Sequence, residues 1–123
     1  MAGYLGLKNH SVNLFDRNPD KVKVLSSKGG IHLEGKIKGF GKIDRITNEL
    51  PEAVEEADVI MVTTVANAHK ELAMNLAPLL RDNQIVILNP GRTCGALEFK
   101  QGLIHSNCDK KIYIAEAQTL VYA

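Results

Sequence analysis

Residues that could hold a nucleotide stand near the front of this chain. Asp16 closes the short apolar run 12–15, and Arg17 follows it. A carboxylate at the end of the second strand of a dinucleotide-binding unit accepts hydrogen bonds from a ribose and repels a 2′-phosphate, which favours NAD. Arg17 could instead pair with that phosphate, so NADP stays open. In the alternative interpretation, Asp16 and Asn18 only form a turn and cap the next helix.

Small and hydroxyl side chains follow the most continuous apolar run, residues 58–63. At the carboxyl end of a strand, where ligands bind in open α/β sheets, such side chains let a cofactor approach closely. We predict cofactor contacts for this segment, at Thr63, Thr64, Val65 and Ala66. His69 is a conceivable general base, but a histidine at the start of an amphipathic helix is more often a surface or capping residue.

Two further loops carry polar residues after predicted strands. Asn89 and Gly91 follow the strand 84–88, and we expect them to line the nicotinamide side of the same crevice. Arg92 could meet an anionic group of a substrate or cofactor, although a plain strand-to-helix turn is the ordinary alternative. Glu116 and Gln118 follow the last predicted strand, and we assign them to the substrate.

These side chains need strands to position them, and the sequence predicts strands that alternate with helices. Asn18 and Pro19 begin one helix as cap and first residue. A glycine-rich stretch predicts a β-hairpin inserted before the third strand. The alternation predicts an α/β fold with a parallel, doubly wound sheet and right-handed crossovers. The predicted helices are 1–9, 19–27, 50–57, 67–81 and 93–107, and the predicted strands are 12–15, 31–34, 36–40, 44–47, 58–63, 84–88 and 111–116.

The strand before Asp16 resembles the second strand of a Rossmann-like unit, and no first strand or glycine-rich turn precedes it in this sequence. We therefore predict one partial dinucleotide-binding domain over residues 1–123. The first strand lies centrally in the order 3-2-1-4-5-6, so its absence separates the second strand from the fourth. Because unpaired buried strand edges are costly, we expect re-pairing, strand exchange or self-association, and hence a homo-oligomer.

Composition restricts the function classes. The chain of 123 residues is 45% hydrophobic and 24% charged, as in soluble globular proteins. Nine Lys and Arg against four Asp and Glu give residues 1–45 a charge of +5, and six against ten give residues 46–123 a charge of −4. This distribution suits an anionic cofactor but lacks the basicity of a nucleic-acid binder. With no candidate membrane or signal segment, we expect a cytoplasmic protein.

The two cysteines predict no cross-link or metal site. Cys94 and Cys108 lie in different predicted elements without metal-ligand spacing, so we expect two free thiols.

The apolar run from 58 to 63 is typical of a parallel strand that is buried on both faces, and we expect both faces of this strand to be buried.

Three segments resemble the N-terminal domain of the opine dehydrogenase family, the octopine and nopaline dehydrogenase group of NAD(P)-dependent reductases. The resemblance lies in residues 58–69, 86–99 and 115–123. It implies the reductive condensation of a 2-oxo acid with an amino acid, with hydride from the nicotinamide, and it assigns Asp16 to the adenosine ribose. It places the catalytic histidine and aspartate in a C-terminal helical domain beyond Ala123.

The resemblance therefore assigns no catalytic role to the four histidines of this chain, His10, His32, His69 and His105. We expect the 123 residues to be inactive alone. Two alternatives stay open. A ketopantoate reductase or glycerol-3-phosphate dehydrogenase type shares the same strands and crossovers, although segments 89–92 and 116–123 favour the opine type. A non-catalytic binding or interaction module on a Rossmann scaffold is the other.

Overall fold

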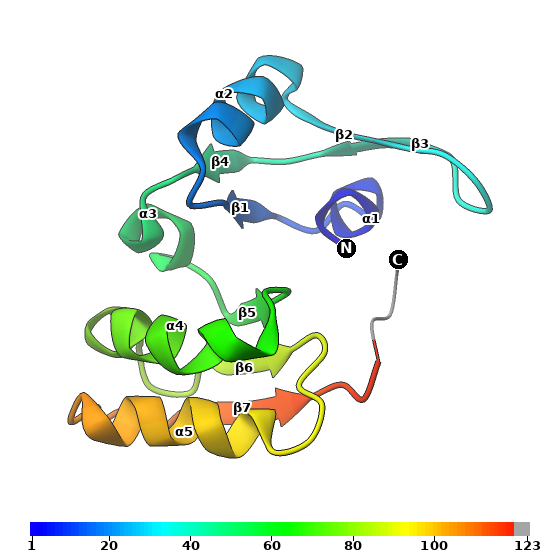
Figure 1. The fold of residues 1–123 in the computed structure, drawn as a ribbon. Coiled ribbons are helices and arrows are strands. Elements are labelled where there is room, and N and C mark those ends of the chain that lie inside the picture. Colours follow the sequence, from blue (N-terminus) through cyan, green and yellow to red (C-terminus); the bar gives the residue numbers. More distant parts are fainter. Residues whose placement is uncertain (120–123) are drawn as a thin grey trace. The chain divides into compact units, whose positions relative to one another are not determined.

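The computed structural model describes residues 1–119, which form two compact units that divide after Glu55 (Figure 1). Both units are α/β, and each contains parallel strands. The first unit contains α1 (Ala2–Leu7), β1 (Asn13–Phe15), α2 (Pro19–Lys28), β2 (Gly30–Leu33), β3 (Gly39–Lys42), β4 (Arg45–Thr47) and α3 (Leu50–Val54). The second contains β5 (Val59–Val62), η1 (Ala66–Ala68), α4 (His69–Leu76), η2 (Ala77–Leu79), β6 (Ile85–Leu88), α5 (Gly95–His105) and β7 (Tyr113–Glu116).

The first unit combines a parallel strand pair with a hairpin. β1 pairs with β4 in parallel, with Leu14 opposite Ile46, while β2 and β3 form the antiparallel hairpin that the glycine pattern predicts. The N-terminal helix α1 packs on this hairpin, and its inner face carries only the buried glycines Gly3 and Gly6. The small residues of α1 therefore allow this helix to pack closely against the β2–β3 hairpin rather than against the parallel strands.

Helix α2 begins as the sequence predicts. The Asn18 Oδ1 accepts hydrogen bonds from the backbone N–H groups of Asp20 (2.9 Å) and Lys21 (3.4 Å), and Pro19 occupies the first helical position. The helix ends at Gly29, whose φ of 67° is left-handed and suits a residue without a Cβ. No residue of α2 is buried, so this helix contributes little to a core.

The second unit is a three-stranded parallel sheet in the order β5-β6-β7, with α4 and α5 side by side on one face (Figure 1). Val62, Val86 and Leu88 are buried, together with Phe99 of α5 and Leu76 of α4. The two helices approach closely at Gly102, where a Cβ atom would lie 2.7 Å from the Ala73 Cβ. A larger residue there would force the helices apart.

The prediction that both faces of β5 are buried is wrong. Val59 is 45% exposed, and the residues in register with it, Ile85 and Tyr113, are 38% and 48% exposed. The physical reason is that α4 and α5 cover the same face of the sheet. Among the described residues of this unit, no element covers the opposite face, so one apolar row of each strand stays accessible.

The fold class predicted from the sequence is confirmed as a Rossmann-like α/β arrangement with parallel strands. Within the described residues β1 pairs only with β4, and β5 pairs only with β6, so the strands predicted to flank a central first strand are not paired with each other. No helix in residues 1–119 is long and apolar enough to cross a bilayer.

Candidate functional site

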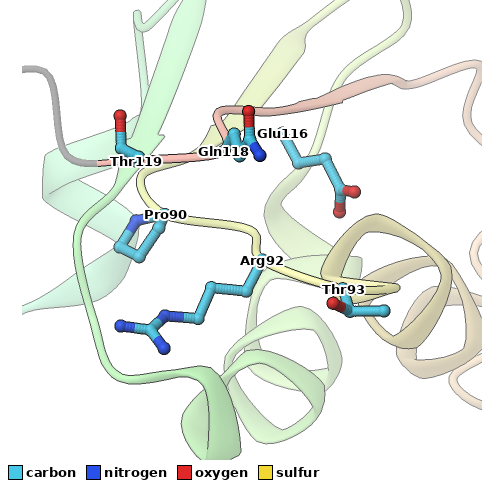
Figure 2. A pocket seen from close by; sticks show the side chains of 6 residues that line it. All are labelled: Pro90, Arg92, Thr93, Glu116, Gln118 and Thr119. Carbon is cyan, nitrogen blue, oxygen red and sulfur yellow. The ribbon is translucent and has the colours of Figure 1, made fainter.

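A pocket of about 690 Å³ lies where β6 and β7 end. Both walls come from the second unit, and Figure 2 shows the six lining side chains, Pro90, Arg92, Thr93, Glu116, Gln118 and Thr119. Backbone hydrogen bonds hold the two loops together, because Gly91 N–H donates to the Ala117 carbonyl (3.0 Å) and Ala117 N–H donates to that of Leu88 (2.9 Å). The carboxyl ends of adjacent parallel strands thus form the site.

Arg92 provides the positive charge of the pocket. Its side chain is exposed and makes no hydrogen bond or ion pair with any described residue. Its φ of 50° is left-handed, as is the φ of 63° at Cys94 in the same loop, and the Asn89–Pro90 peptide is cis. Left-handed non-glycine residues are costly and are concentrated at functional sites, so the loop 89–94 combines an available guanidinium with a strained backbone.

Glu116 provides the negative charge and is fixed in place. Its Oε2 accepts a 2.7 Å hydrogen bond from the backbone N–H of Ala96 in the first turn of α5. The positive end of the helix dipole stabilises a carboxylate at this position. Gly91 makes the approach possible, since a Cβ there would collide with the Glu116 Cβ. The need for close packing therefore explains a glycine at position 91.

The two charges of the pocket are separate. Figure 2 shows the Arg92 and Glu116 side chains extending in different directions, and they form no ion pair. Gln118, Thr93 and Thr119 add neutral hydrogen-bonding groups. A pocket with a free guanidinium and a distinct carboxylate can bind a carboxylate group and an ammonium group.

Three of the predicted substrate residues, Arg92, Glu116 and Gln118, lie together in this pocket. Asn89 does not line the pocket. The residue is 1% exposed, and its side-chain amide donates to the Ile87 carbonyl at 3.2 Å. Thr93, a polar residue of the same predicted loop as Arg92, lines the pocket as well. The resemblance at residues 120–123 lies outside the described residues.

The cofactor contacts predicted for residues 63–66 fall on an exposed segment that begins at the carboxyl end of β5 and ends at the first residue of η1. Asp16 and Arg17 belong to the first unit. The Asp16 Oδ1 accepts from Asn18 N–H (2.9 Å), and its Oδ2 lies 3.8 Å from the Lys21 Nζ. Asp16 therefore makes the turn of the alternative interpretation, yet about a third of its side chain stays exposed. Arg17 is exposed and unpaired among the described residues. These cofactor roles stay predictions.

The expectation that His69 is a surface or capping residue is wrong, because its side chain is completely buried. The reason is its position on α4, where His69, Ala73 and Leu76 share the buried face at spacings of four and seven residues. Counting the small Ala73 as part of the apolar stripe would have identified this.

Within residues 1–119, no group of three or more His, Cys, Asp or Glu side chains could hold a metal ion. Cys94 and Cys108 are free thiols. The polar chemistry of the described site therefore rests on Arg92 and Glu116.

Comparison with known proteins identifies the relatives of this chain. Residues 1–92 match the family described as Ketopantoate reductase PanE/ApbA. The chain is also 34% identical over 122 residues to an opine dehydrogenase from Arthrobacter sp. (strain 1C), an alignment that covers 98% of this chain and 34% of that protein. The chain thus spans about a third of the length of the curated relative. It belongs to the ketopantoate reductase PanE/ApbA family of oxidoreductases, as an opine dehydrogenase-like N-terminal domain.

Proposed function

We propose that this chain is the dinucleotide-binding part of an opine dehydrogenase-like oxidoreductase, which uses NAD(P)H to condense a 2-oxo acid reductively with an amino acid. The observation that carries the proposal is the pocket with a free Arg92 and a separate Glu116. The nicotinamide supplies the hydride when it is bound. No catalytic residue is assigned to the chain.

Two groups of residues suit the cofactor. Asp16 directly follows β1 and its carboxylate is partly exposed, so it retains acceptor capacity for ribose hydroxyls beyond its turn and its ion pair. This favours NAD, and Arg17 is the residue that would accommodate NADP. The exposed loop Thr63–Ala66 offers hydroxyl groups and small side chains at the carboxyl end of β5. Asn89 and Gly91 after β6 belong to the predicted set as well, but both are buried in this structure, so the exposed residues carry the cofactor proposal.

The charges of the pocket suit the two substrates. A 2-oxo acid and an amino acid each bring a carboxylate, for which the Arg92 guanidinium is a bidentate donor. The amino group that must be condensed is a cation until it loses a proton, and Glu116 offers it a carboxylate acceptor. Gln118 can donate to or accept from either substrate.

Calorimetric titration of NADH, with NADPH alongside, tests the cofactor proposal. We expect Asp16→Ala to weaken NADH binding about tenfold and to narrow the preference over NADPH. The matched control is Asp20→Ala. It removes a nearby carboxylate from the first turn of α2 and leaves Asp16 and the end of β1 unchanged. Equal effects of the two substitutions would show that Asp16 acts only through the general charge of the segment.

A ketopantoate reductase type of reaction is the second candidate, because that family description matches residues 1–92. The two comparisons differ in how much of the pocket they cover. Glu116 and Gln118 lie outside that match but inside the alignment with the opine dehydrogenase, which favours the opine type. Assays of the full-length protein separate them, since only the opine type requires an amino acid together with the 2-oxo acid.

We also propose a cytoplasmic homo-oligomer. Free thiols suit a reducing compartment. β1 and β5 each pair along one edge only within the described residues, and exposed parallel edges favour association. Light scattering coupled to size-exclusion chromatography measures the mass, and a monodisperse monomer over the accessible concentration range would count against the oligomer.

A further inference from the structure

His69 is the most unusual buried group of the second unit. It opens α4, its side chain is 0% exposed, and neither Nδ1 nor Nε2 has a hydrogen-bond partner among the described residues. Buried polar atoms are nearly always paired, because desolvation without a partner is costly. An apolar side chain would fill this position without that cost. A use for one of the ring nitrogens would explain the residue type.

The direction of Nδ1 identifies the candidate partner. A Cβ placed on Gly95 would lie 3.5 Å from the His69 Nδ1 and 3.4 Å from the Glu116 Oε2. Both polar atoms therefore border the same small space beside the Gly95 Cα. The third neighbour of that space is the apolar Leu88 Cδ1 at 3.5 Å. The carboxylate of Glu116 is thus an acceptor near the imidazole Nδ1, although the two groups form no hydrogen bond in this structure.

Glu116 has the capacity to accept a second donor. Its Oε2 already receives the Ala96 N–H at 2.7 Å, which leaves other lone pairs of the carboxylate available. A single donor from the backbone fixes one oxygen but allows the carboxylate plane to rotate about it. A second donor from the opposite side of Gly95 would fix that plane.

We propose that His69 is a positioning residue for Glu116, with the Nδ1–H of the imidazole donating to the carboxylate across the space beside Gly95, either through one water molecule or after a small shift of the Glu116 side chain, since the two groups form no direct hydrogen bond in this structure. In this link the imidazole carries a proton on Nδ1. Glu116 is held between the first turn of α5 and the start of α4, and its orientation toward the pocket is set. The importance of that orientation for substrate rests on the proposed function, but the link itself does not.

Nitrogen-15 NMR of the histidine side chains tests the link in the protein without any ligand. We expect the Nδ1–H tautomer for His69, and we expect Glu116→Gln to shift its Nδ1 resonance. Glu98→Gln is the matched control, because it neutralises a carboxylate in the first turn of α5, close in sequence to the Ala96 amide, and leaves Glu116 in place. His10, His32 and His105 serve as internal references. An Nε2–H tautomer of His69, or an Nδ1 chemical shift that is the same in the Glu116→Gln variant, overturns the proposal.

Two substitutions provide an independent measurement at the Ala96 amide. His69→Leu keeps an apolar volume but removes the donor, and we expect hydrogen exchange of Ala96 N–H to accelerate about fivefold, the factor of one ordinary hydrogen bond. His69→Asn returns an N–H donor near the Nδ1 position and should restore slow exchange. If both variants exchange alike, His69 only fills space. Failure of these tests leaves cofactor binding by Asp16 unaffected, so the two proposals can be judged separately.

Discussion

The two units of this chain differ in how they are held together. Among the described residues, the first unit buries four apolar side chains, Val12, Ile43, Ala53 and Val54. The second buries more than twice as many, which are Val62, Ala73, Leu76, Ala77, Leu80, Val86, Leu88, Phe99 and Leu103. Since apolar burial is the main favourable term in folding, the second unit has the more stable core.

Their sheets differ in the same direction. The second unit has three parallel strands under two packed helices, whereas the first has two separate two-stranded sheets and a helix, α2, with no buried residue. Two-stranded sheets are marginal without further packing. The proposed functions follow this division, because the charged pocket belongs to the well-packed unit and the ribose acceptor Asp16 belongs to the other.

This difference suggests a coupling between ligand binding and stability. A cofactor that contacts Asp16 binds only the folded first unit, so it should stabilise that unit in proportion to its concentration over its dissociation constant. The proposed substrate pocket needs less such help, because Arg92 lies in the loop after β6, whose Val86 and Leu88 are buried, and Glu116 ends the neighbouring strand β7. The predictions below test the two halves of this comparison.

The largest expected effect comes from one phenylalanine in each unit. Phe99 is 0% exposed in the second unit, and Phe15 is 36% exposed in the first. Phe99→Ala should lower the free energy of unfolding by about 3 to 5 kcal/mol, and Phe15→Ala by about 1 kcal/mol. Denaturant unfolding followed by circular dichroism measures both. Equal losses would contradict the proposed difference in packing.

A smaller effect is expected at the wall of the pocket. Gly91→Ala places a Cβ against that of Glu116, and overpacking of this kind costs about 1 to 3 kcal/mol. Gly95→Ala is the comparison variant: its Cβ would meet its neighbours at 3.4 to 3.5 Å, which is ordinary contact, although it would also fill the space of the proposed link between His69 and Glu116. Thermal unfolding of both variants gives the comparison. A Gly91→Ala protein as stable as the comparison variant would mean that the loop can shift away from Glu116.

Sequence patterns predicted the order and type of the elements well, because local signals are strong here. Asn18 and Pro19 begin α2, Gly29 ends it, and the apolar runs before Thr63 and Asn89 are strands. The sequence also put candidate site residues after β6 and β7, because ligands bind at the carboxyl ends of parallel strands. Arg92, Glu116 and Gln118 line one pocket, and their roles in it stay predictions.

The failures concern which face of an element is covered, and this is decided by tertiary packing. An apolar run such as that of β5 is compatible with burial on one face or on both, so Val59 could not be placed. His69 has the polarity of a surface residue, and only the packing of α4 on α5 buries it. The hydrogen bond between Glu116 and Ala96 joins residues twenty positions apart, and no local pattern predicts such a contact.

A pH-dependent effect is expected in the first unit. Hydrogen bonds from Ser11 and from Val12 N–H, and then the charge of Lys42, hold the pKa of Asp44 below its ordinary value of 3.8. A carboxyl group with a lowered pKa in the folded state stabilises the protein above its unfolded pKa, and this contribution is lost as the pH falls through the folded pKa. Asp44→Asn should therefore destabilise the first unit at neutral pH, with a deficit that shrinks in acid.

Ser11→Ala separates the causes of that lowered pKa. It removes the largest contribution, so the Asp44 pKa should rise toward 3.8. As the pH is lowered, the free energy of unfolding should then begin to fall at a higher pH. Carbon-13 NMR of the Asp44 carboxyl group reads the titration directly. If the titration of Asp44 is unchanged in the Ser11→Ala variant, the backbone of Val12 and the charge of Lys42 carry the effect instead.

The smallest expected effect sharpens the comparison within the second unit. Cys94 precedes α5 with a left-handed φ of 63°, which costs a non-glycine residue about 1 to 2 kcal/mol. Glycine avoids that cost but loses about 0.5 to 1 kcal/mol through the greater entropy of the unfolded chain, so Cys94→Gly should stabilise the protein by at most about 1.5 kcal/mol. Cys94→Ala removes the thiol but keeps the Cβ, and it should give no gain in melting temperature. Stabilisation by alanine as well as glycine would place the cost in the thiol rather than in the backbone of the loop that carries Arg92.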